Sequence, residues 1–72
     1  MTNTALLIKA IEDSGLLKSA ILKRMGIKSY ATLRAKIENE SEFTASEMDK
    51  LCAILGISKD RREAIFFAKA AE

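Results

Sequence analysis

The chain has 72 residues, which allows one compact domain (residues 1–72) with a modest core. Apolar residues make up 49% and charged residues 31%, with a net charge of +2, a balance that disfavours intrinsic disorder. With one Cys and no His, an internal disulfide is impossible, and we expect no metal, no cofactor and no enzyme activity. No apolar run is long enough to span a bilayer and the start lacks a signal-peptide pattern, so we expect a cytoplasmic protein without membrane contact.

Three glycines divide the chain into apolar-periodic segments. Gly15, Gly26 and Gly56 each follow such a segment and precede an apolar residue, a pattern typical of helices that end in a left-handed residue. Periodicity then predicts a first helix over residues 4–14 and a second over residues 17–25. The inward positions of these two helices are predicted to be Leu7, Ile8, Ile11, Leu17, Ile21, Leu22 and Met25.

Three further helices are predicted after Gly26. The third covers residues 29–38, with Ser29 as N-cap. The fourth begins at a capping box of Thr44 and Glu47, with Phe43 placed to pack on Met48, and the fifth covers residues 59–70. Strand signals are absent, so the fold class is all-α, a compact five-helix orthogonal bundle. Its expected core is Leu7, Ile11, Ile21, Leu33, Ile37, Phe43, Leu51 and Leu55, and Cys52 is interpreted as a small buried apolar residue.

The charges are strongly segregated along the chain. Residues 16–37 contain six bases and no acid, whereas residues 38–49 contain five acids and no base. The six bases are Lys18, Lys23, Arg24, Lys28, Arg34 and Lys36. Such a basic patch favours a polyanionic partner. The alternative is a solvated surface whose counter-charges lie in the acidic segment that follows.

The third predicted helix has an outer face suited to a DNA groove. With Leu33 and Ile37 on the core, a rotation of 100° per residue turns a small and basic set outward and puts Tyr30 at the edge of the buried arc. That set is Lys28, Ala31, Thr32, Ala35 and Asn39, with Arg34 and Lys36 on its flanks. Short side chains allow close approach to bases and long cations reach guanine edges or phosphates. The alternative is an ordinary exposed helix, but such helices usually carry i,i+4 ion pairs, which we do not expect on this face.

A family resemblance follows from these segments. The segment Lys18-Ser-Ala-Ile-Leu-Lys-Arg-Met-Gly-Ile-Lys-Ser-Tyr-Ala-Thr-Leu-Arg-Ala-Lys-Ile37 resembles the helix-turn-helix of Cro-like and phage-repressor-type regulators. Residues 41–57 resemble that family's fourth helix, and Ile65-Phe66-Phe67 is similar to the ending of small phage or prophage Cro-like proteins. Two features depart from the family: Leu22 replaces its usual Ala, and the turn is one residue longer.

The resemblance implies a lambda-repressor-like bundle in which the second and third helices form the helix-turn-helix. It implies sequence-specific binding of double-stranded DNA and repression by promoter occlusion, with the third helix in the major groove. The base-reading residues it implies are Ser29, Tyr30, Ala31, Thr32, Arg34 and Ala35, with Arg34 suited to guanine. The phosphate-binding residues it implies are Lys18, Lys28, Lys36 and Asn39. For Tyr30 the alternative is a half-buried cover on the core with only its hydroxyl near DNA.

One small domain reads few base pairs, so we expect a homodimer on a palindromic operator. Phe66 and Phe67 are the candidate interface residues; being adjacent in a helix, they cannot both face one narrow core stripe, and one is expected to pack inward. The alternative function is a helix-turn-helix-like interaction module, an antitoxin or antirepressor, that binds a protein partner. Nothing in the sequence implies a small-molecule ligand.

Overall fold

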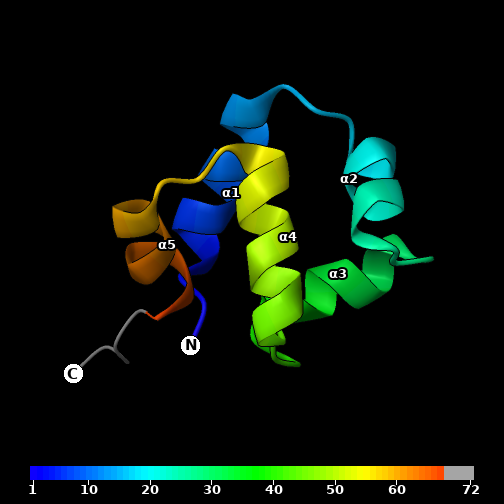
Figure 1. Cartoon of the computed structure of the whole chain (residues 1–72). Helices are drawn as coiled ribbons and strands as arrows, with labels where there is room; N and C mark the ends of the chain where they lie inside the picture. Colours follow the sequence, from blue (N-terminus) through cyan, green and yellow to red (C-terminus); the bar gives the residue numbers. More distant parts are fainter. Residues whose placement is uncertain (68–72) are drawn as a thin grey trace.

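The computed structural model describes residues 1–67, which form five helices joined by short connections (Figure 1). The helices are α1 (Thr4–Ser14), α2 (Lys18–Met25), α3 (Tyr30–Ile37), α4 (Ala45–Leu55) and α5 (Lys59–Phe66). The described residues contain no strand, which confirms the predicted all-helical class. The fifth helix was predicted to extend to residue 70, and residues 68–70 lie outside the described residues.

The predicted helix ends are confirmed by the backbone. The left-handed φ of 76° at Gly26 ends α2, and the other two glycines end α1 and α4 in the same way. At the start of α4, the Thr44 hydroxyl accepts from the Glu47 N–H while the Glu47 carboxylate accepts from the Thr44 N–H, as the capping box predicts. These local rules therefore fix where most of the helices begin and end.

Helix α1 packs against α3, α4 and α5, and α2 packs against α3 and α4. Figure 1 shows α1 and α5 on one side of α4 and α2 with α3 on the other. The α2–α3 pair, which carries the basic segment, therefore lies on the opposite side of the molecule from α5.

Most of the predicted core is confirmed. Six of its eight members are buried, and the other two, Ile11 and Leu55, are partly buried against the same cluster. The full buried apolar set is Leu7, Ala10, Ile21, Met25, Leu33, Ile37, Phe43, Leu51, Cys52, Ile57, Ile65 and Phe66. The burial of Cys52 agrees with its interpretation as a small core residue, and desolvation raises the pKa of its thiol.

Two predictions of inward-facing residues were wrong. Leu17 is 74% exposed, because it is the N-cap residue of α2 in an extended conformation and so does not share the helical stripe. Ile8 is 44% exposed, because α1 buries the face of Leu7 and Ala10, and the next residue after Leu7 is turned about 100° away.

The N-terminal residues are tied to the bundle by polar contacts that no local pattern predicts. The Asn3 N–H donates to the Ile65 carbonyl at 2.6 Å, and the Thr4 hydroxyl donates to the Ile37 carbonyl at 2.6 Å. Thr2 is buried to 8% exposure. The first residues of the chain thus bridge the ends of α3 and α5.

Candidate nucleic-acid interface

A short connection sets the direction of α3. After Gly26, the Ile27 N–H donates back to the Leu22 carbonyl at 3.0 Å, which closes the end of α2. Ser29 then caps α3 by accepting from the Thr32 N–H. The two helices therefore cross at a steep angle, as expected for a connection of this length (Figure 1).

The face of α3 opposite the core points to solvent. Leu33 and Ile37 are buried at 1% and 3% exposure, while Ala31 and Thr32 are exposed and Ala35 is half-buried. Among the residues predicted to read bases, Tyr30 and Ala35 are half-buried, and the exposed ones are Ser29, Ala31, Thr32 and Arg34.

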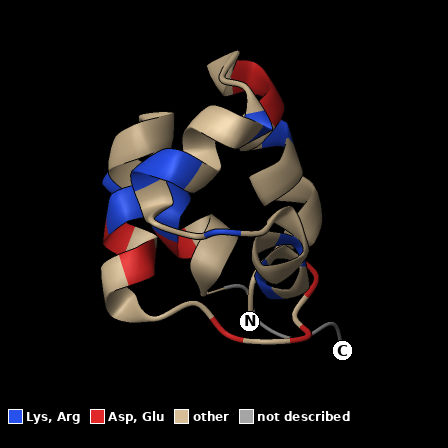
Figure 2. Cartoon of the chain, turned by 90° about the vertical axis from the view of Figure 1, so that its right-hand side faces the viewer, with Lys and Arg blue, Asp and Glu red and all other residues tan. Residues whose placement is uncertain are grey.

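Four cations on α2 and on the connection to α3 have no carboxylate partner within residues 1–67. Lys18, Lys23, Arg24 and Lys28 are all exposed, and within residues 1–67 none of them forms an ion pair. Figure 2 looks onto this side and shows basic segments on α2, on the connection that crosses the front and on α3, with acidic segments toward the edges of the view. We call these four residues the free cation set.

Tyr30 and Lys18 form a contact between α3 and α2. The Lys18 ammonium lies 4.7 Å from the centre of the Tyr30 ring, within the range of a cation–π interaction. Tyr30 is half-buried and packs against the core cluster. Its position fits the alternative of a half-buried cover better than that of a fully exposed base reader.

Arg34 is exposed but paired, contrary to the expectation that this face lacks i,i+4 ion pairs. Its Nε donates to Glu38 Oε2 at 2.7 Å, four residues along the helix. The hydrogen bond to Glu38, followed by the charge of that carboxylate, raises the pKa of the guanidinium, so Arg34 stays cationic. Any contact with DNA must therefore compete with Glu38 or use the terminal nitrogens of the guanidinium.

Two of the expected phosphate ligands are engaged inside the protein. Lys36 Nζ donates to Glu47 Oε1 and to the Glu42 carbonyl, both at 3.0 Å, and its side chain is 15% exposed. Because Thr44 and Lys36 both donate to it, the Glu47 carboxyl has a lowered pKa, with the Thr44 backbone N–H the larger cause. Lys36 thus joins α3 to the start of α4.

Asn39 is used in a similar way. Its Oδ1 accepts from the Thr2 N–H and its Nδ2 donates to the Thr2 carbonyl, each at 2.9 Å, while its backbone has a φ of 65°. Both polar atoms of the side-chain amide thus bond to the Thr2 backbone. Lys36 and Asn39 therefore leave the candidate phosphate-binding set, and Lys18 and Lys28 remain in it.

The two adjacent phenylalanines have opposite environments. Phe66 is 2% exposed and meets Phe43 edge to face, with ring centres 5.4 Å apart. Its assignment to a dimer interface was wrong, because it is part of the core. Phe67, the C-cap residue of α5, is 58% exposed and stays a candidate for a contact between subunits.

Other kinds of site receive little support within residues 1–67. No group of His, Cys, Asp or Glu side chains there is arranged to hold a metal ion. None of the helices in that part of the chain has the length and hydropathy needed to cross a bilayer.

Comparisons with protein-family models, curated proteins and solved structures found no match to this chain.

Proposed function

We propose that the protein binds double-stranded DNA sequence-specifically, with α3 in the major groove, and represses transcription by occluding a promoter. The observation that carries this proposal is the exposure of Ala31 and Thr32 on α3, together with the unpaired free cation set on α2 and on the connection before α3. Small side chains permit close approach to base edges. Binding of unpaired cations to phosphates releases counterions, which makes the free energy of DNA binding more favourable. The resemblance to Cro-like regulators and a lambda-repressor-like bundle supports the same proposal.

Residue roles follow from what each side chain is free to do. Ala31 and Thr32 meet base edges, and Arg34 contacts guanine through its terminal guanidinium nitrogens while Nε stays on Glu38. Ser29 acts mainly as the helix cap, and Tyr30 positions Lys18. Lys18 and Lys28 bind phosphates near the start of α3 and set the register.

Binding as a homodimer completes the proposal. Two domains related by a two-fold axis read a palindromic operator, which gives the affinity that a single short helix lacks. The exposed Phe67 is the contact residue we propose. Sedimentation of wild type and Phe67→Ala tests this: dimer for the former and monomer for the latter are expected, and a monomer in both cases refutes it.

The DNA proposal is tested by selecting bound fragments from a random duplex library and measuring affinity against salt. We expect a palindromic consensus and an affinity that falls linearly with the logarithm of salt concentration. Arg34→Ala should cost about 1–3 kcal/mol and relax preference at one base pair. Lys18→Ala should weaken binding to all DNA sequences and reduce by about 1 the slope of log affinity against log salt concentration. Lys59→Ala, on the distant α5, should change neither the affinity nor the slope.

Three outcomes contradict these assignments. Equal losses on selected and random duplexes would remove Arg34 from base reading. An unchanged salt slope in Lys18→Ala would remove that residue from phosphate binding. Copurification with a protein partner and no retention on DNA would instead favour the alternative function, a helix-turn-helix-like module that binds a protein partner.

A further inference from the structure

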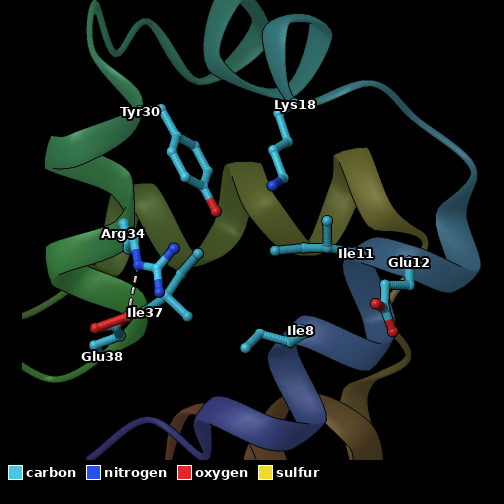
Figure 3. A pocket seen from close by; sticks show the side chains of 8 residues that line it. All are labelled: Ile8, Ile11, Glu12, Lys18, Tyr30, Arg34, Ile37 and Glu38. Carbon is cyan, nitrogen blue, oxygen red and sulfur yellow. Dashed lines mark hydrogen bonds and ion pairs between the residues drawn. The ribbon is translucent and has the colours of Figure 1, made fainter.

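A cavity of about 230 Å³ opens between α1, the start of α2 and α3 (Figure 3). Ile8 and Ile11 of α1 lie on one side of the cavity, and Tyr30 and Ile37 of α3 lie on the other (Figure 3). Ile8 is a large apolar residue left 44% exposed at this position. The volume is below the roughly 300–1,000 Å³ of pockets for drug-sized ligands, so only a small molecule fits.

The cations and the hydroxyl of the cavity come from α2 and α3. Figure 3 shows the Lys18 ammonium and the Tyr30 hydroxyl pointing into the cavity, with the Arg34 guanidinium extending toward it from α3. The two acidic residues of the rim, Glu12 and Glu38, lie at its outer sides, and Glu38 is already paired with Arg34. The interior therefore presents isoleucine side chains together with two cations and a hydroxyl.

This combination selects a ligand of defined chemistry. A simple inorganic anion would leave the isoleucines exposed. A neutral hydrocarbon would remove water from Lys18 and Arg34 without offering a hydrogen bond or an ion pair in its place. A carboxylate on a short apolar or aromatic group satisfies both sides, because charge-assisted hydrogen bonds reach the cations while the group covers the isoleucines. We propose that this cavity binds a small amphipathic carboxylate.

A regulatory consequence rests on the proposed function. Lys18 and Arg34 are also proposed DNA contacts, so a bound carboxylate competes with DNA for the same two cations. The ligand then lowers the affinity for DNA, and DNA lowers the affinity for the ligand by the same factor. The proposed regulator would in this way release its operator when the carboxylate accumulates.

Ligand binding is tested on the free protein, without DNA, by titrating 3-phenylpropionate and following backbone amide resonances by NMR. We expect saturable shifts at residues around the cavity, and binding about tenfold or more weaker for the neutral analogue 3-phenylpropan-1-ol. Ile8→Glu places a carboxylate at the cavity and should abolish binding. Leu6→Glu, at a residue of α1 that is 39% exposed and does not line this cavity, should leave binding unchanged.

Several results would overturn the proposal. These are the absence of saturable shifts, equal binding of acid and alcohol, or equal loss in the two glutamate variants. Circular dichroism of both variants checks that they are folded. Because no DNA is present, failure here leaves the DNA proposal intact, and failure of DNA binding leaves this titration interpretable.

The coupling is tested by a second measurement. At constant ionic strength, 3-phenylpropionate should weaken DNA binding by the wild type but not by Ile8→Glu. Ligand binding with unchanged DNA affinity would overturn the coupling while keeping the site.

Discussion

The neighbouring phenylalanines at the end of α5 give a sharp test of the core. Phe66→Leu removes ring carbons from a site that is 2% exposed, whereas Phe67→Leu makes the same change at a site that is 58% exposed. At about 0.8 kcal/mol per buried methylene, the lost burial at Phe66 amounts to about 2 kcal/mol. Loss of the edge-to-face contact with Phe43 adds about 0.5–1.5 kcal/mol.

The expected total for Phe66→Leu is therefore about 3 kcal/mol, against roughly 4–11 kcal/mol for a whole domain of this size. The thermal midpoint should fall by about 10–25 °C. Phe67→Leu should change the free energy of unfolding by less than about 0.5 kcal/mol.

Urea unfolding followed by far-ultraviolet circular dichroism measures both values at a protein concentration low enough to keep the chain monomeric. Equal losses in the two variants, or no loss in Phe66→Leu, would refute the assignment of Phe66 to the core and Phe67 to the surface.

Three further predictions concern the polar contacts around α3. The Glu47 carboxyl has a lowered pKa in the folded protein, so its contribution to stability is full above the ordinary carboxyl pKa and is lost as pH falls through the lowered value. Glu47→Gln should therefore flatten the acid part of the curve of unfolding free energy against pH. An unchanged curve would contradict this. Asn39→Ala should lower the free energy of unfolding by about 2–3 kcal/mol, because it removes the hydrogen bonds to Thr2 and puts an alanine in a left-handed backbone conformation. Asn39→Gly should recover about 1 kcal/mol, since glycine adopts that conformation without strain. Equal unfolding free energies of the two variants would refute the contribution of the backbone. Lys36→Gln should lower the free energy of unfolding by about 1–2 kcal/mol yet keep the salt slope of DNA binding, and a reduced slope would return Lys36 to the phosphate-binding set.

The helices could be predicted from the sequence because their signals are local. Glycine ends and the Thr44–Glu47 capping box depend on residues within one turn of each other, and the structure has them where the sequence places them. Periodicity likewise identified the most buried residues of α1 to α4, such as Leu7 and Leu51, but the expected core contained no residue of α5.

The parts of the candidate site that differed from prediction depend on distant contacts. The partners of Lys36 and Asn39 are 11 and 37 residues away in the chain, so no pattern within one helix identifies them. Helical periodicity separates Phe66 from Phe67 by about 100° but cannot say which faces the core. The cavity beside Ile8 requires three helices to converge, which is a property of packing and not of any one segment.

The central claim, that the outer face of α3 meets duplex DNA, is tested most directly by a matched pair of alanine-to-glutamate variants. Ala31 lies in the first turn of α3, where the helix dipole stabilises a negative charge, so Ala31→Glu should leave the fold intact. Ala53 is likewise exposed, on α4, but lies in the last turn, where the helix dipole disfavours a glutamate, so circular dichroism checks that Ala53→Glu is folded. By fluorescence anisotropy on a selected duplex, Ala31→Glu should weaken binding by at least about 2 kcal/mol while Ala53→Glu matches the wild type at the same ionic strength. Wild-type affinity in Ala31→Glu, or equal loss in both variants, would contradict the claim.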